Sequence, residues 1–218
     1  MNSRRSILLL PLAGLGACAA LPAEQAMGTP AAAVARHSAA SVIASGVPAG
    51  AAVAVAPGLA VTNAHVVRAA ARPLLLRDSS GVEVAPRAVR EVPGTDLAFL
   101  DLPPGFLRPA ATAERPPRVG EPLWAVGPEG LGRAVASGPV LRPSLHLPGY
   151  GRGFTARLGA LMGFSGGPVV NAQGQVAGLT TALLGRPGAA SAALMLGADL
   201  DGLARPGREV FVLALAQG

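Results

Sequence analysis

Short apolar runs separated by turn-forming residues are the feature that most restricts how this chain can fold. The 218 residues include 29 glycines and 21 prolines, which are spread along the chain. Such frequent breaks favour many short elements over long helices, and closely spaced apolar runs between them are typical of β-strands. Half of the residues are hydrophobic, so the chain can build a core and disorder is not expected. The sequence therefore predicts an all-β fold.

Two sets of candidate strands flank a proline-rich connector that begins at Pro103 and ends at Pro117. The first set comprises residues 53–56, 59–62, 74–76, 82–84 and 97–100, and the second comprises residues 123–126, 134–136, 169–170, 176–180 and 192–196. Two such sets predict two β-subdomains, each a barrel or a sandwich. Residues 199–205 are a candidate short helix, and the pattern of residues 210–216 fits either a strand or a helix.

Residues 1–22 have the three parts of a secretory signal: the positive charges of Arg4 and Arg5, an apolar stretch, and small residues. The apolar stretch is short for a membrane span. Its end, Leu-Gly-Ala-Cys, resembles the lipobox of bacterial lipoproteins, which implies that Cys18 carries a lipid and that the protein is exported to the periplasm or cell envelope and held at a membrane. The alternative is an ordinary signal peptide that is cut nearby. Residues 23–40 are alanine- and proline-rich and predict a flexible tether.

Charge and cysteine content exclude several classes of function. All 18 basic residues are arginines, but they are scattered and not interleaved with aromatic side chains, so we expect no nucleic-acid binding. Cys18 is the single cysteine, so no disulfide forms within the chain. No metal-binding or nucleotide-binding fingerprint is present, and we expect neither a metal nor a cofactor.

Residues 163–168 read Gly-Phe-Ser-Gly-Gly-Pro and hold the most informative candidate residue, Ser165. Glycines on both sides let the backbone turn sharply and bring N–H groups close to a reacting atom, where they can stabilise an oxyanion. A serine in such a turn is a candidate nucleophile. The pattern alone also fits the nucleophile elbow of α/β-hydrolases, or a surface turn with an idle serine.

The order of residues narrows these alternatives. A serine nucleophile needs a base, usually histidine, and His37, His65 and His146 all precede Ser165. The α/β-hydrolase order requires a histidine after the serine, and the subtilisin order requires an aspartate before the histidine. The first aspartate is Asp78, so no aspartate precedes His65. The order histidine, aspartate, serine is satisfied directly.

His65 and Asp96 have the contexts that this order requires. His65 follows an apolar run, where a strand meets a turn, although a buried structural histidine would fit the same pattern. Asp96 immediately precedes the apolar run 97–100 and is a candidate buried carboxylate, which a hydrogen bond from the imidazole would satisfy. Asp101 is the nearest competitor, but its position inside the run favours solvent exposure.

Together these contexts resemble the trypsin-like serine proteases, and among them the bacterial HtrA/Deg-type proteases, over about residues 41–203. The resemblance implies two six-stranded antiparallel β-barrels with the active site in the cleft between them. The protease domain would then span residues 41–218, with the first barrel at about 41–105 and the second at about 118–218.

The resemblance also implies a role for each site residue. Ser165 would be the nucleophile, His65 the general base and then acid, and Asp96 the group that orients the imidazole. The amides of Gly163 and Ser165 would form the oxyanion hole. A polypeptide substrate would bind as an extended strand, in contact with Gly159, Thr180, Thr181, Ala182 and Leu183. No acidic residue is evident there, so we expect a preference for small or medium apolar side chains at the cleaved position.

Three departures from the family stand out. Phe164 precedes the nucleophile where the family usually has Asp or Asn, and phenylalanine cannot form the salt bridge that activates digestive zymogens, so we do not expect activation by N-terminal cleavage. We also expect no PDZ domain after the protease region. Val66 replaces the disulfide cysteine of animal members.

Two alternative functions remain: a protease-like module that binds extended peptides without cutting them, and an esterase that uses the same triad.

Overall fold

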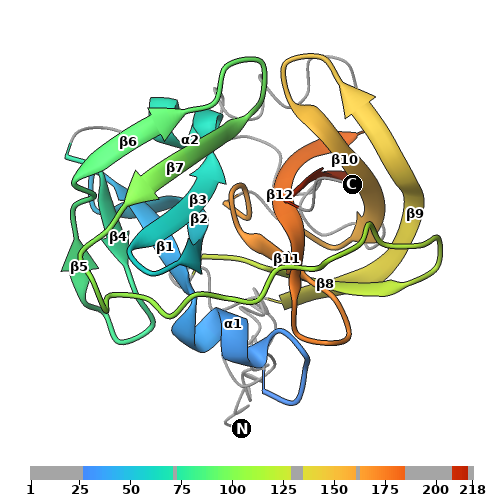
Figure 1. The fold of residues 1–218 in the computed structure, drawn as a ribbon, viewed down its shortest axis with the longest axis horizontal. Coiled ribbons are helices and arrows are strands. Elements are labelled where there is room, and N and C mark those ends of the chain that lie inside the picture. Colours follow the sequence, from blue (N-terminus) through green and yellow to red (C-terminus); the bar gives the residue numbers. More distant parts are fainter. Residues whose placement is uncertain (1–26, 71–72, 129–134, 161–162, 185–207, 216–218) are drawn as a thin grey trace, which may run out of the picture.

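The computed structural model describes residues 27–70, 73–128, 135–160, 163–184 and 208–215. Within them, the strands form two antiparallel sheets that lie side by side, the first on the left and the second on the right of Figure 1. The candidate signal peptide, Cys18, the candidate strand 192–196 and the candidate helix 199–205 lie outside the described residues.

The first sheet has seven strands in the order β5-β4-β1-β2-β3-β7-β6. These strands are β1 (Ala39–Ala44), β2 (Val47–Ala56), β3 (Leu59–Asn63), β4 (Leu75–Arg77), β5 (Glu83–Val84), β6 (Ala88–Glu91) and β7 (Leu97–Asp101). Helix α2 (Ala64–Ala69) follows β3 without a gap. The core of this sheet consists mainly of small aliphatic side chains, which suits a chain with few aromatic residues.

The second sheet is a closed six-stranded barrel in the order β10-β13-β12-β11-β8-β9. These strands are β8 (Pro122–Val126), β9 (Val135–Leu147), β10 (Gly151–Leu158), β11 (Pro168–Val170), β12 (Val176–Leu184) and β13 (Arg208–Ala214). The ambiguous segment 210–216 therefore contributes a strand. The two-barrel all-β fold is confirmed, although the first unit is a seven-stranded sheet instead of a six-stranded closed barrel.

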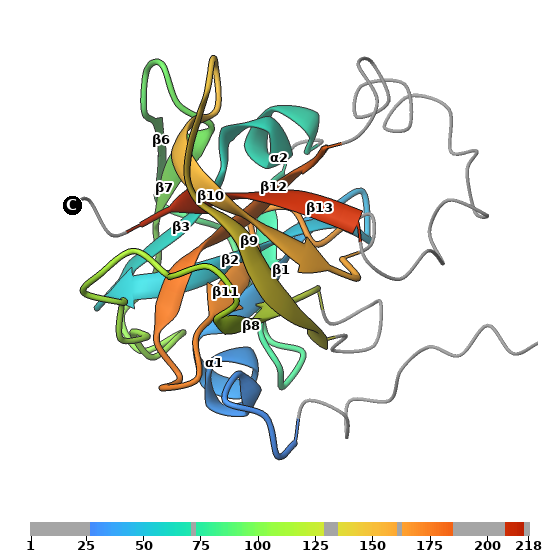
Figure 2. The same cartoon turned by 90° about the vertical axis from the view of Figure 1, so that its right-hand side faces the viewer.

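The predicted tether is wrong for the part of it that the structure describes. Ala32–His37 forms helix α1, and Ala39 and Ala40 begin β1. Val34 and Ala35 are buried in a cluster that includes Val126 and Val170 of the second barrel. In Figure 1 the helix lies below the junction between the two sheets, and Figure 2, turned by 90°, also shows it at the lower end of the molecule. Burial of this apolar face holds the segment in one place.

No helix within the described ranges is long and apolar enough to cross a lipid bilayer.

Three strands were not anticipated from the sequence, namely β1, β6 and β10. Strand β6 is exposed along its whole length, and β10 carries exposed Arg152 and Arg157 between buried residues. Neither β6 nor β10 has the continuous apolar run that predicts a strand elsewhere in the chain.

Candidate active site

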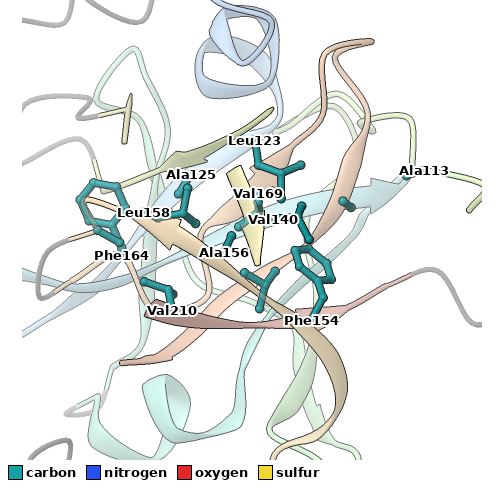
Figure 3. Close-up of a cluster of buried hydrophobic side chains, with 13 residues drawn as sticks. Ala113, Leu123, Ala125, Val140, Phe154, Ala156, Leu158, Phe164, Val169 and Val210 are labelled. Atoms are coloured by element: carbon teal, nitrogen blue, oxygen red, sulfur yellow. The ribbon is translucent and has the colours of Figure 1, made fainter. Parts of the chain in front are cut away.

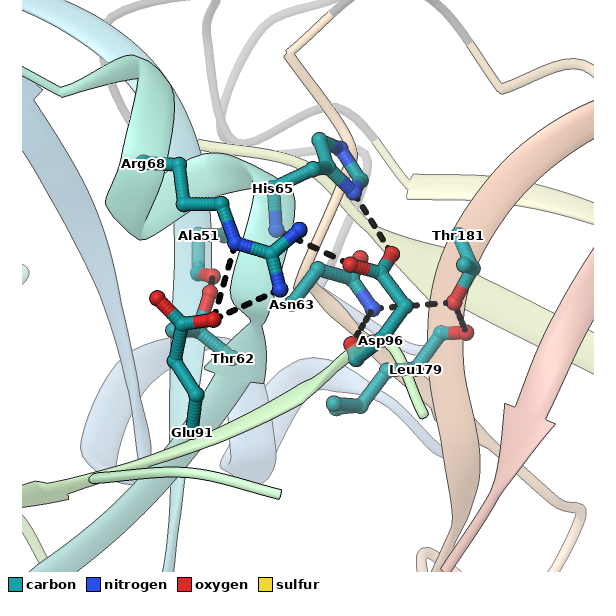
Figure 4. Close-up of polar contacts among 9 residues, drawn as sticks. All are labelled: Ala51, Thr62, Asn63, His65, Arg68, Glu91, Asp96, Leu179 and Thr181. Carbon is teal, nitrogen blue, oxygen red and sulfur yellow. Dashed lines mark hydrogen bonds and ion pairs between the residues drawn. The ribbon is translucent and has the colours of Figure 1, made fainter. Parts of the chain in front are cut away.

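The imidazole of His65 lies against the carboxylate of Asp96. His65 occupies the first turn of α2, directly after β3, and Asp96 directly precedes β7. Strands β3 and β7 pair with Asn63 opposite Leu97, which brings the two residues together. The His65 Nδ1 atom lies 2.6 Å from Asp96 Oδ2, and the His65 backbone N–H donates to Asp96 Oδ1 at 2.9 Å (Figure 4). The carboxylate thus holds both the ring and the backbone of His65.

The backbone of Asp96 is fixed from both barrels. Its carbonyl oxygen accepts hydrogen bonds from the Ala64 amide at 3.1 Å and from Asn63 Nδ2 at 3.0 Å. Its amide donates to the carbonyl of Tyr150, in the second barrel, at 3.2 Å. Asp96 is only 4% exposed, so its carboxylate depends on hydrogen bonds from His65 in place of water.

Ser165 lies in a tight turn between the two barrels. The Gly167 amide donates to the Phe164 carbonyl at 2.9 Å, and Gly166, the third residue of the turn, has φ +79°. A β-turn with positive φ at this position favours glycine. The Ser165 carbonyl accepts a hydrogen bond from the Ala51 amide of β2 at 2.9 Å, and the Gly166 amide donates to the Thr180 carbonyl of β12 at 2.8 Å. The turn is therefore bonded to both sheets.

The same turn approaches the helix that carries His65. A Cβ atom placed on Gly50 would lie 2.7 Å from Val66 Cγ1 and 2.8 Å from the Ser165 carbonyl oxygen, so the two segments face each other across this glycine. Ser165 is partly exposed. Between these two described residues, no hydrogen bond joins Ser165 Oγ to the imidazole of His65. Catalytic hydrogen bonds are often loose without substrate, and they tighten when substrate binds.

Replacing Gly166 by alanine is expected to lower the free energy of unfolding by about 3 kcal/mol, because positive φ and crowding add together. A Cβ there would lie 2.2 Å from both the Ala51 carbonyl oxygen and Thr62 Oγ1. Gly120→Ala is the control, since Gly120 has φ +81° but no atom within 4 Å of the added Cβ. Chemical denaturation should show a loss of about 1 kcal/mol for the control. Equal losses in the two variants would contradict the close packing of the turn.

The other predicted site residues flank this turn. Gly163 has φ +91°, and neither its amide nor that of Ser165 donates a hydrogen bond to another described residue. Gly159 is exposed just beyond β10. On β12, the side chains of Thr180 and Thr181 are buried and that of Ala182 is partly exposed.

Near the site, one edge of β12 lacks a partner among the described strands. From Thr180 to Leu184, including Leu183, the strand pairs with β13 on one side, whereas β11 reaches only Leu179 on the other. No described strand covers the second edge beyond Thr180. An unpaired strand edge can accept an extended peptide by backbone hydrogen bonding.

Asn63 links the two barrels near His65 in the sequence, a role that its sequence context does not indicate. Its Nδ2 donates to the Asp96 carbonyl and, at 3.0 Å, to Thr181 Oγ1, which in turn donates to the Leu179 carbonyl at 2.9 Å (Figure 4). Both amide protons are thus used. An asparagine two residues before the candidate base was visible in the sequence, but its partner is 118 positions away.

Thr181→Val is expected to lower the free energy of unfolding by about 1–3 kcal/mol, because a buried N–H of Asn63 loses its acceptor. Thr181→Ser keeps the hydroxyl oxygen and should remain within about 1 kcal/mol of the wild type. Urea denaturation of the two variants gives the comparison. A loss in Thr181→Val that is no larger than the loss in Thr181→Ser would contradict the role assigned to the hydroxyl.

A salt bridge lies on the rim of the site. Arg68 of α2 donates from Nε and Nη2 to Glu91 Oε2 at 2.8 and 2.6 Å (Figure 4). The hydrogen bond with Glu91 and its negative charge raise the pKa of Arg68, so the guanidinium stays charged.

Among the described residues, no group of three or more His, Cys, Asp or Glu side chains is arranged to hold a metal ion.

The family model of the trypsin-like peptidase domain matches residues 50–179. The chain therefore belongs to the trypsin-like peptidase family.

One curated relative resembles part of the chain. It is 33% identical over 139 residues to the periplasmic serine endoprotease DegP of Salmonella typhimurium. This match covers 61% of the chain and 29% of DegP, so the chain spans less than a third of that relative.

Solved structures show the same fold. The active form of the Rv3671c protease from M. tuberculosis superposes with a TM-score of 0.65 at 20% identity, covering 99% of this chain and 89% of that one. The HtrA-type protease AlgW with a bound tripeptide superposes with a TM-score of 0.63 at 24% identity, covering 84% of this chain and 58% of AlgW. These likenesses support the two-barrel architecture.

Proposed function

We propose that this protein is a serine endopeptidase that cleaves polypeptides through an acyl-enzyme, with His65, Asp96 and Ser165 as its catalytic triad. The observation that carries the proposal is the 2.6 Å contact between His65 Nδ1 and Asp96 Oδ2, beside the turn that holds Ser165. The carboxylate fixes the tautomer in which Nδ1 carries the proton and Nε2 is free to accept one.

The proposed reaction follows from these positions. His65 Nε2 accepts the proton of the Ser165 hydroxyl as Oγ attacks the scissile carbonyl, and Asp96 stabilises the resulting imidazolium. The amides of Gly163 and Ser165 donate to the oxyanion of the tetrahedral intermediate. The imidazolium then protonates the leaving amine, and the C–N bond breaks. In the second half of the reaction, His65 accepts a proton from water as the water oxygen attacks the acyl carbonyl, and the imidazolium then protonates Ser165 Oγ as it leaves.

The proposed substrate is an extended polypeptide segment that adds as a strand to the open edge of β12. The edge beyond Thr180 supplies backbone groups for it, and AlgW, an HtrA-type relative, has been solved with a bound tripeptide. Gly159, Thr180 and Ala182 offer no charge, so we expect small or medium apolar side chains at the cleaved position.

Labelling with a fluorophosphonate, together with hydrolysis of matched peptide and ester substrates, tests this function. An endopeptidase should be labelled once per chain and should turn over the peptide. Turnover of the ester alone would favour an esterase. Peptide binding without labelling would favour a binding module.

We also propose that the protein is exported to the periplasm and anchored through a lipid on Cys18, which lies outside the described residues. The signal-like residues 1–22 and the periplasmic location in the name of DegP support this. Radiolabelled palmitate should be incorporated by cells that express the full chain, and Cys18→Ala should abolish this incorporation. Unchanged incorporation would refute the anchor at Cys18.

A further inference from the structure

The side chain next to Ser165 is an unusual one for this position and is fully enclosed. Phe164 is 1% exposed and belongs to the core of the second barrel, where it lies near Leu158 and Ala125 (Figure 3). Phe154 belongs to the same core but lies at its opposite end (Figure 3). The residue that precedes the nucleophile is therefore attached to the barrel interior.

The ring of Phe164 rests on the backbone of Gly127, directly after β8. A Cβ added to Gly127 would lie 2.7 Å from Cε2 and 2.8 Å from Cζ of the ring. Gly127 does not have positive φ, so its backbone conformation is open to other residues. The space taken by the ring, and not the backbone angle, is what requires glycine here.

Both ends of the turn that carries Ser165 touch this same segment. Phe164 touches it through its ring, and a Cβ on Gly167, the last residue of the turn, would lie 2.1 Å from the Val126 carbonyl oxygen. The Gly167 amide closes the turn onto the Phe164 carbonyl. A shift of the ring against Gly127 would therefore move Ser165 as well.

We propose that Phe164 and Gly127 form an apolar anchor that sets the position of Ser165 relative to His65. Phe164 is a positioning residue that acts through the turn, since its ring is buried in the core of the second barrel. The inference rests on the proposed endopeptidase function. The contact contains no charged group, so it positions the nucleophile without an ion pair.

A reciprocal pair of substitutions tests the anchor. Gly127→Ala places a methyl group against the ring. We expect it to lower kcat at least about 30-fold, because displacing Ser165 by up to about 1 Å costs a factor of this order. KM should change less than about 3-fold. In Phe164→Leu the Cε2 and Cζ atoms that the methyl group would meet are absent. In that background Gly127→Ala should lower kcat less than about 3-fold, because the two positions are coupled.

Phe154→Leu is the matched control, since it makes the same change in the same core far from the turn. Rates are compared per folded molecule, with the folded fraction taken from circular dichroism. Phe164→Leu should lower kcat and the rate of fluorophosphonate labelling about 10-fold, whereas Phe154→Leu should keep both within about 3-fold of the wild type. If Gly127→Ala does not fold, this comparison of the two leucine variants decides the question.

Two results would overturn the anchor while the proposed function stands: equal losses of kcat in the two leucine variants, or an equal effect of Gly127→Ala in both backgrounds of an active enzyme. A wild-type protein that is neither labelled nor able to cleave peptides would instead refute the proposed function, and the anchor as a positioning device would fall with it.

Discussion

Replacing Ser165 by alanine is expected to lower kcat by about 10⁵–10⁶-fold, the scale seen when the nucleophile of a serine hydrolase is removed. The alanine has no hydroxyl for His65 to deprotonate, so no acyl-enzyme forms. The fold should be unchanged, because the Ser165 carbonyl still accepts from Ala51 and no described residue bonds to the hydroxyl.

Peptide hydrolysis and fluorophosphonate labelling measure this loss, and the melting temperature verifies folding. Ser144→Ala, an exposed serine on β9, serves as the control and should retain full activity. If the Ser165 variant retained activity within about 10-fold of the wild type, another group would be the nucleophile.

Asp96→Asn is expected to lower kcat about 10⁴-fold with little change in structure. The new carboxamide oxygen can still accept the His65 backbone N–H, which leaves its NH₂ group facing Nδ1. The imidazole must then accept at Nδ1 and carry its proton on Nε2, where it cannot take a proton from Ser165.

Asp101→Asn is the matched control for this substitution. Asp101 is the nearest aspartate in the sequence and is partly exposed on β7, where it pairs with Arg90 at 3.0 Å. Exposed ion pairs contribute at most about 1 kcal/mol to stability, so the control should stay fully active. Similar losses of kcat in both variants, measured with one peptide substrate at saturation, would argue against the assigned role of Asp96.

The order and contexts of the polar residues were sufficient to predict the contact between His65 and Asp96. His65 follows one apolar run and Asp96 precedes another, and antiparallel pairing of those two runs in one sheet places the residues side by side. The two-barrel class could likewise be predicted. Glycines and prolines mark the turns between the short apolar runs, and the sequence contexts of His65, Asp96 and Ser165 resemble those of the family.

Features that depend on distant packing could not be predicted. Residues 32–37 are rich in alanine and lack a strong pattern, and they fold as α1 only because Val34 and Ala35 find the apolar junction of the barrels. Asn63 acquires its role from Thr181, far along the chain. Phe164 was recognisable as a departure from the family, but the glycine that accommodates its ring lies 37 positions earlier.

A crystal structure of the protein after reaction with a peptidyl phosphonate tests the central proposal most directly. We expect phosphorus bonded to Ser165 Oγ, His65 Nε2 within about 3.2 Å of that oxygen, and the peptide paired with the open edge of β12. An adduct on another residue, no adduct at all, or an imidazole beyond hydrogen-bonding reach of Ser165 would contradict the proposed triad.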